Sequence, residues 1–106
     1  MINIEITEIE IIPIKPRDGL VAFASCVINE SLYVGSIGIH CSPSNAEGFR
    51  LVFPSKTLLN GKEIPCVHPI NKEAGELLTR AIVNKFRKIV EKRLDENVAT
   101  IERESR

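Results

Sequence analysis

The strongest constraint in this sequence is a change of apolar period at about Pro69. Beyond Asn71 the apolar residues recur every three or four positions, which is typical of one amphipathic helix. The members of this stripe are Ala74, Leu77, Leu78, Ala81, Ile82, Phe86, Ile89, Val90 and Leu94. Asn71 is a good N-cap residue, and Glu73 and Glu76 suit the positive end of the helix dipole. The sequence therefore predicts one long C-terminal helix.

Before Pro69 the pattern predicts short strands separated by turns. Ile4, Ile6, Ile9 and Ile11 are spaced by two, three and two residues, so a bulge is expected near Thr7-Glu8, with Glu5, Glu8 and Glu10 facing water. Pro13 and Pro16 suit a sheet edge. Further strands are expected over 20–28, 32–39 and 49–53, with a returning segment over 64–67. Asp18-Gly19 and Asn60-Gly61 are tight-turn signals, and 41–48 has the composition of a loop.

These elements define an α+β class, with a small antiparallel sheet of about four or five strands followed by the helix. A chain of 106 residues fits a single domain. We place that domain at 1–94 and interpret 95–106 as a charged tail, a possible fraying extension of the helix. No apolar run is long enough for a membrane span, and the N-terminus lacks the pattern of a signal peptide, so we expect a cytoplasmic protein with no membrane partner.

Some residues have the chemistry of a metal or catalytic site without the spacing of one. The pairs His40-Cys41 and Cys66-x-His68 contain zinc-binding residue types, but their spacing matches no known finger, and we expect no metal. Ser55-Lys56 and the Cys66/His68 pair lack a third orienting group, so we expect no catalysis. No phosphate-binding glycine motif is present, and no cofactor or small-molecule substrate is expected. Cys26, inside an apolar strand, is expected to be buried and inert.

A basic run on the helix is the clearest charged feature of the chain. From Arg80 to Arg93 there are six basic residues against the single acid Glu91, although the whole chain has a formal net charge of zero. Clustered cations bind phosphate backbones through counterion release. A solvated helix face with cations towards its C-terminal half explains the same pattern, and the spacing alone favours neither interpretation.

The order of several short motifs resembles the stage V sporulation protein G family (SpoVG, septation protein). The resemblance covers about residues 4–94. It rests on Phe53-Pro54-Ser55-Lys56, the Asn60-Gly61 turn, His68-Pro69-Ile70-Asn71 and the helical Ala81-Ile82-Val83-Asn84-Lys85-Phe86. Each motif is weak alone, and their order and spacing give the resemblance its specificity.

The resemblance implies a bacterial homodimer that binds DNA or RNA and regulates septation or sporulation, without catalysis. The expected phosphate contacts are Lys56, carried over from the PSK motif, and four residues of the basic run on the helix, Arg80, Arg87, Lys88 and Lys92. His68, Pro69 and Asn71 are expected to shape the junction before the helix. An alternative is a protein–protein interaction module without nucleic-acid binding.

The chain also departs from the family pattern. Gly38, Thr57 and Gly75 stand where family members often carry a basic residue, and the loop 41–47 is a few residues longer than usual. Each missing cation removes a potential phosphate contact. We therefore expect weaker binding, or binding that has moved onto the helix.

Overall fold

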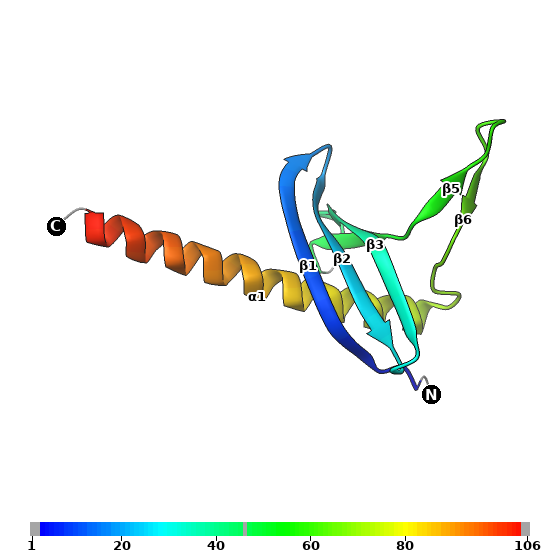
Figure 1. Cartoon of the computed structure of the whole chain (residues 1–106), viewed down its shortest axis with the longest axis horizontal. Helices are drawn as coiled ribbons and strands as arrows, with labels where there is room; N and C mark the ends of the chain where they lie inside the picture. The colour runs from blue at the N-terminus through cyan, green and yellow to red at the C-terminus, as the bar shows by residue number, and fades with distance from the viewer. Residues whose placement is uncertain (1–2, 46, 105–106) are drawn as a thin grey trace.

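The first four strands form one antiparallel sheet whose spatial order is their order in the chain, β1-β2-β3-β4. The structure is a computed structural model that describes residues 3–45 and 47–104. Residues 93–104 are described by their backbone alone. A separate two-stranded ribbon and one long helix follow (Figure 1). The elements are β1 (Ile6–Arg17), β2 (Leu20–Ile28), β3 (Leu32–Cys41), β4 (Phe49–Val52), β5 (Ser55–Thr57), β6 (Glu63–Pro65) and α1 (Lys72–Glu104).

Tight turns connect the first three strands, with two residues between β1 and β2 and three between β2 and β3. Asp18 and Gly19 have φ values of 51° and 89°, and Arg17 pairs with Leu20 across them. Asn29 and Glu30 have φ values of 52° and 54°. Positive φ at both central residues defines the turn whose twist matches that of a hairpin, and Asn, Asp and Gly tolerate it best. The expected Asp18-Gly19 hairpin is confirmed.

The irregular spacing of isoleucines in β1 corresponds to a bulge. The pairing with β2 shifts register between Thr7 and Glu10, and Glu8 lies in the left-handed region with φ of 48°. The extra residue restores the alternation, so that Ile9 and Ile11 contact the core while Glu8 and Glu10 are exposed. The bulge and the exposed acids were both predicted. β1 is an edge strand, as Pro13 and Pro16 indicate.

The ribbon β5–β6 differs from the sequence-based expectation for its second strand. The segment expected over 64–67 starts at Glu63 and ends at Pro65, and it pairs with β5, outside the main sheet. The reason is local: Pro65 cannot donate to a ladder, and the next N–H, from Cys66, bonds the Pro54 carbonyl at 3.0 Å. Strand β3 also continues to Cys41, two residues beyond the expected end. The α+β class, with a four-stranded sheet and a long helix, is confirmed.

Helix α1 crosses one face of the sheet and continues past it (Figure 1). The core joins Leu78, Ile82 and Phe86 to buried residues of β2 and β3, namely Ala22, Ala24, Cys26, Val34, Ile37 and Ile39. Three small side chains on the central strand β2 allow the larger helix side chains to approach closely. The backbone of α1 is helical to Glu104. The division into a 1–94 domain and a fraying tail stays a prediction, and residues 105–106 of that tail lie outside the described chain.

The opposite face of the sheet, here called the outer face, carries exposed apolar side chains. Ile12 of β1, Phe23 of β2 and Val52 of β4 lie in one row across the sheet. Gly38 of β3 occupies the position between Phe23 and Val52 in this row. Ile12 is 62% exposed and Tyr33 of β3 is 70% exposed. No described segment covers these residues, which makes this face a candidate for contact with another chain.

The cysteines differ in exposure in a way that a thiol reagent will report. Cys26 is buried in the core, and burial raises the pKa of its thiol, whereas Cys41 and Cys66 are exposed. We expect two thiols to react in the native protein and Cys26 to react only after unfolding, because the thiolate is the reactive form. Counting modified thiols by mass spectrometry with and without denaturant measures this. Three reactive thiols in the native state would contradict the buried position of Cys26.

Candidate nucleic-acid interface

The helix that carries most of the candidate residues starts at a well-defined cap. The Asn71 side-chain Oδ1 accepts a hydrogen bond from the Ala74 backbone N–H at 2.8 Å, which satisfies one of the free donors of the first turn. The His68 ring Nδ1 donates to the Pro69 carbonyl at 2.9 Å. The predicted N-cap role of Asn71 is confirmed. His68 and Asn71 thus make local bonds at the strand-to-helix junction.

Three exposed lysines form a row along α1. Lys85, Lys88 and Lys92 follow one another at intervals of three and four residues, and all three are exposed. Residues at these intervals lie on one side of a helix, here over about 10.5 Å at 1.5 Å per residue. We call this set the lysine row. Lys88 and Lys92 were predicted contacts, while Lys85 was recognised only as part of the basic run, although its helical phase could have placed it with them.

The two candidate arginines of α1 lie away from the lysine row and differ in their surroundings. Arg80 is exposed and has no ion pair or hydrogen bond within the described residues. Arg87 instead holds the β3–β4 loop: its guanidinium donates to the Glu47 backbone carbonyl and lies 3.4 Å from the Glu47 carboxylate. It also lies 6.0 Å from the centre of the Phe49 ring, which contacts Phe86 edge-on at 5.2 Å. The structure therefore gives Arg87 a local role that the sequence did not indicate.

Replacing Arg87 should cost more stability than replacing Arg80. Arg87→Ala removes a partly exposed ion pair, a backbone hydrogen bond and a contact with Phe49, together about 1 kcal/mol. Arg80→Ala is expected to stay within about 0.5 kcal/mol of the parent protein, as is usual for a surface substitution. Urea unfolding of both variants checks the difference. Equal stability of the two would show that Arg87 does not anchor the loop.

Lys56 lies far along the chain from the helix residues, on the β5–β6 ribbon. It is exposed and pairs with Ile64 across the ribbon. Figure 1 shows the ribbon projecting from the body of the protein on the opposite side from the C-terminal half of α1. The predicted contacts therefore fall into separate regions: Lys56 on the ribbon, and the others along the helix.

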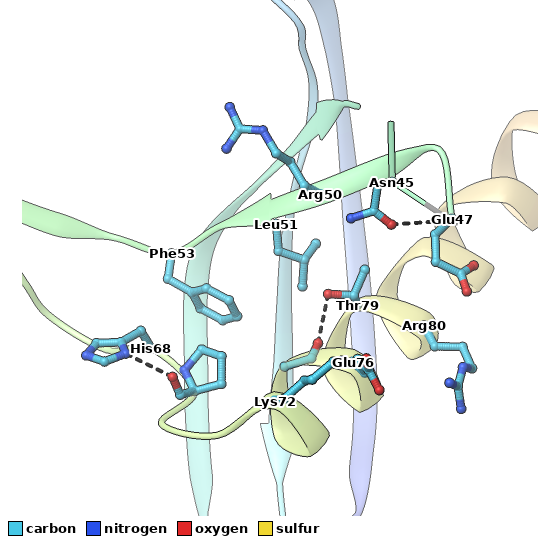
Figure 2. A pocket seen from close by; sticks show the side chains of 12 residues that line it. Asn45, Glu47, Arg50, Leu51, Phe53, His68, Lys72, Glu76, Thr79 and Arg80 are labelled. Carbon is cyan, nitrogen blue, oxygen red and sulfur yellow. Dashed lines mark hydrogen bonds and ion pairs between the residues drawn. The ribbon is translucent and has the colours of Figure 1, made fainter. Parts of the chain in front are cut away.

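A groove of about 810 Å³ lies between β4 and the first half of α1. Figure 2 shows Leu51 of β4 and Phe53, the residue after β4, pointing towards the helix, while Arg50 points away on the other side of the strand. The rim carries both signs of charge, with Lys72 and Arg80 near Glu47 and Glu76. The Lys72 Nζ atom lies 3.9 Å from the Glu76 Oε1 atom, so these two side chains form an ion pair. This mixture gives the groove no preference for an anion.

The departures from the family pattern lie in different parts of the molecule. Gly38 is buried in β3, Thr57 is exposed on the ribbon, and Gly75 lies in the first turns of α1 against Pro69. Within the part of the chain that the structure describes, no three side chains of His, Cys, Asp or Glu converge as metal ligands would. Over the same residues, no helix has the length and apolarity to cross a membrane.

Comparison with known proteins agrees with the motifs. The sequence model of the SpoVG family matches residues 4–88. A protein of Treponema denticola, named as a candidate septation protein SpoVG, is 26% identical over 84 residues. The aligned region spans 79% of this chain and 87% of that relative. The residues that the family model matches thus include the sheet, the ribbon and the first half of α1.

Proposed function

Because this chain belongs to the SpoVG family, we propose that it is a nucleic-acid-binding regulator that acts as a homodimer. The observation that carries the proposal is the lysine row, a set of three exposed cations on one side of α1. The Treponema denticola relative is named as a septation protein, and we extend that cellular role to this chain. The proposed function is binding and includes no catalytic step. We propose a cytoplasmic location, where bacterial nucleic acid is found.

The physical basis of binding is electrostatic. Lys85, Lys88 and Lys92 each have an exposed ammonium group, and each phosphate that such a group neutralises releases condensed counterions. Contacts of this kind position a protein without reading sequence. Lys56 and Arg80 are further exposed cations that add to the positive electrostatic potential of the protein. The charge of Arg87 is partly neutralised by Glu47.

The homodimer is supported by the outer face of the sheet and by its open edge. Ile12, Phe23, Tyr33 and Val52 expose apolar surface, and β4 has a neighbouring strand only on its β3 side. Exposed apolar faces and strand edges are usually covered in solution. A second copy of the chain would cover the same face on both subunits, as in a two-fold symmetric dimer.

The second candidate function is a protein-interaction module without nucleic-acid binding. The same outer face favours it, because the apolar surface suits a different protein partner as well as a second copy. The two functions differ in salt dependence. Binding to phosphates weakens steeply with salt, whereas binding through an apolar face does not.

The test of the proposed function is a binding titration against duplex DNA, single-stranded DNA and RNA at about 50 and 200 mM salt. At least one of these nucleic acids should bind, with an affinity that falls as salt rises. Absence of binding to all three at the lower salt would favour the protein-interaction module.

Sedimentation at about 50 μM, above the Kd of a moderate interface, tests the dimer separately. The expected mass is that of two chains, and Tyr33→Asp should shift it towards one because the charge would be buried in the contact. Glu30→Asp, at the exposed β2–β3 turn, is the control and should leave the mass unchanged. A monomer at this concentration would contradict the dimer.

A further inference from the structure

The β5–β6 ribbon is an arm that makes little contact with the rest of the molecule. Residues 55–65, here called the arm, connect β4 to the segment before α1 and project from the body (Figure 1). The core of the protein contains none of their side chains. The arm therefore has a shape that the fold does not require, which suggests a role in binding.

The tip of the arm presents one apolar side chain in a fixed position. Leu59 has a relative exposure of 110%, the highest of the exposed large apolar residues. The turn beneath it is closed by the Gly61 N–H donating to the Leu58 carbonyl at 2.9 Å and the Leu58 N–H donating to the Lys62 carbonyl at 2.8 Å. Gly61 has the left-handed φ of 85° that this turn needs. Leu59 is thus held outwards by ordered backbone.

The residues around Leu59 favour a nucleic acid over a protein as the partner. The arm has two lysines, Lys56 and Lys62, against one acid, Glu63, so its formal net charge is +1. The Asn60 side-chain oxygen accepts from the Lys62 N–H at 3.0 Å, which leaves its NH₂ group as a donor. A single leucine is far smaller than the roughly 800 Å² per partner of a specific protein interface. One leucine is sufficient, however, to insert between two base pairs.

We propose that the arm enters the minor groove of duplex DNA and that Leu59 inserts between adjacent base pairs, bending the duplex. Minor-groove proteins use Lys and Asn beside an apolar wedge in this way, and the kink allows the duplex to contact more of the protein. Lys56 lies on β5 and Lys62 directly precedes β6, so that both would lie beside the phosphates of such a groove. The inference rests on the proposed nucleic-acid binding and adds to it a duplex DNA ligand and a bending activity.

The experiment measures bending and affinity on the same DNA. A duplex of about 30 bp with a donor and an acceptor dye at its ends should show increased energy transfer when the protein binds, since wedges of this kind kink DNA by about 20–90°. Leu59→Ser should abolish the increase and weaken binding about tenfold, as loss of one buried leucine implies. Ile70→Ser is the matched control, because Ile70 is 88% exposed and lies outside the arm. It should leave both quantities unchanged.

A second variant reports insertion directly. The chain has no tryptophan, so Leu59→Trp introduces one indole whose emission should be quenched by stacking when duplex DNA binds. Duplex RNA, with its wide and shallow minor groove, should quench it much less.

The outcomes separate this inference from the proposed function. Bending that persists in Leu59→Ser, or salt-sensitive binding without any bending, would overturn the wedge and leave nucleic-acid binding in place. Failure of the parent protein to bind any nucleic acid would overturn both. A change of dimer mass in Leu59→Ser with bending intact would assign the tip to a contact between two copies and would also overturn the wedge.

Discussion

Removing the lysine row by Lys85→Ala, Lys88→Ala and Lys92→Ala together is expected to weaken nucleic-acid binding about a hundredfold at physiological salt. Each lost phosphate contact lowers the slope of log affinity against log salt by about 0.9, which corresponds to about fivefold in affinity near 0.15 M salt. Alanine is a strong helix former, so α1 should remain intact. Titrations at several salt concentrations measure both the affinity and the slope.

The control for this variant has the same change of net charge elsewhere. Lys15, Arg17 and Lys72 are exposed cations that lie outside the lysine row, and their joint replacement by alanine should lower affinity far less. Similar losses in both triple variants would show that net charge, and not the position of the row, determines binding. No loss in either would show that the lysine row is simply a solvated face.

Truncating Ile82 should have the largest effect on stability. Ile82 is fully buried where α1 crosses the sheet, and Ile82→Ala is expected to cost about 3 kcal/mol from lost burial and the cavity left behind. A domain of this size has a free energy of unfolding of about 5–15 kcal/mol, so the loss is a substantial fraction. Urea unfolding at one fixed protein concentration measures it, because association would otherwise shift the midpoint.

Val90→Ala is the control variant for Ile82→Ala on the same helix. Val90 is 37% exposed, so its truncation should cost less than about 1 kcal/mol. If Ile82→Ala cost no more than Val90→Ala, the helix would not be docked on the sheet through this face in solution.

The features that the sequence predicted well are those encoded by neighbouring residues. The Asp18-Gly19 turn depends on φ preferences at two positions, the β1 bulge on the spacing of four isoleucines, and the Asn71 cap on a bond to Ala74. Burial of Cys26 followed from its place in an apolar strand. Each of these can be recognised within a window of a few residues.

The local role of Arg87 was missed because it depends on a contact between distant residues. Arg87 and Glu47 are 40 positions apart, and nothing near either residue indicates that they meet. As a result, the sequence placed Arg87 among the free cations, and only the structure separates it from the lysine row. The first strand of the ribbon was missed for another reason: β5 has only three residues, Ser55–Thr57, which is too short for an apolar alternation to be recognised.

The order of the strands in the sheet has a consequence for how the protein is made. Every neighbouring pair in β1-β2-β3-β4 is also adjacent in the chain, so each hairpin closes a short loop, which favours rapid folding. A ribosome adds about 5–20 residues per second from the N-terminus. We expect the sheet to assemble while α1 is still being synthesised, with its apolar face briefly exposed to chaperones until the helix emerges and covers it.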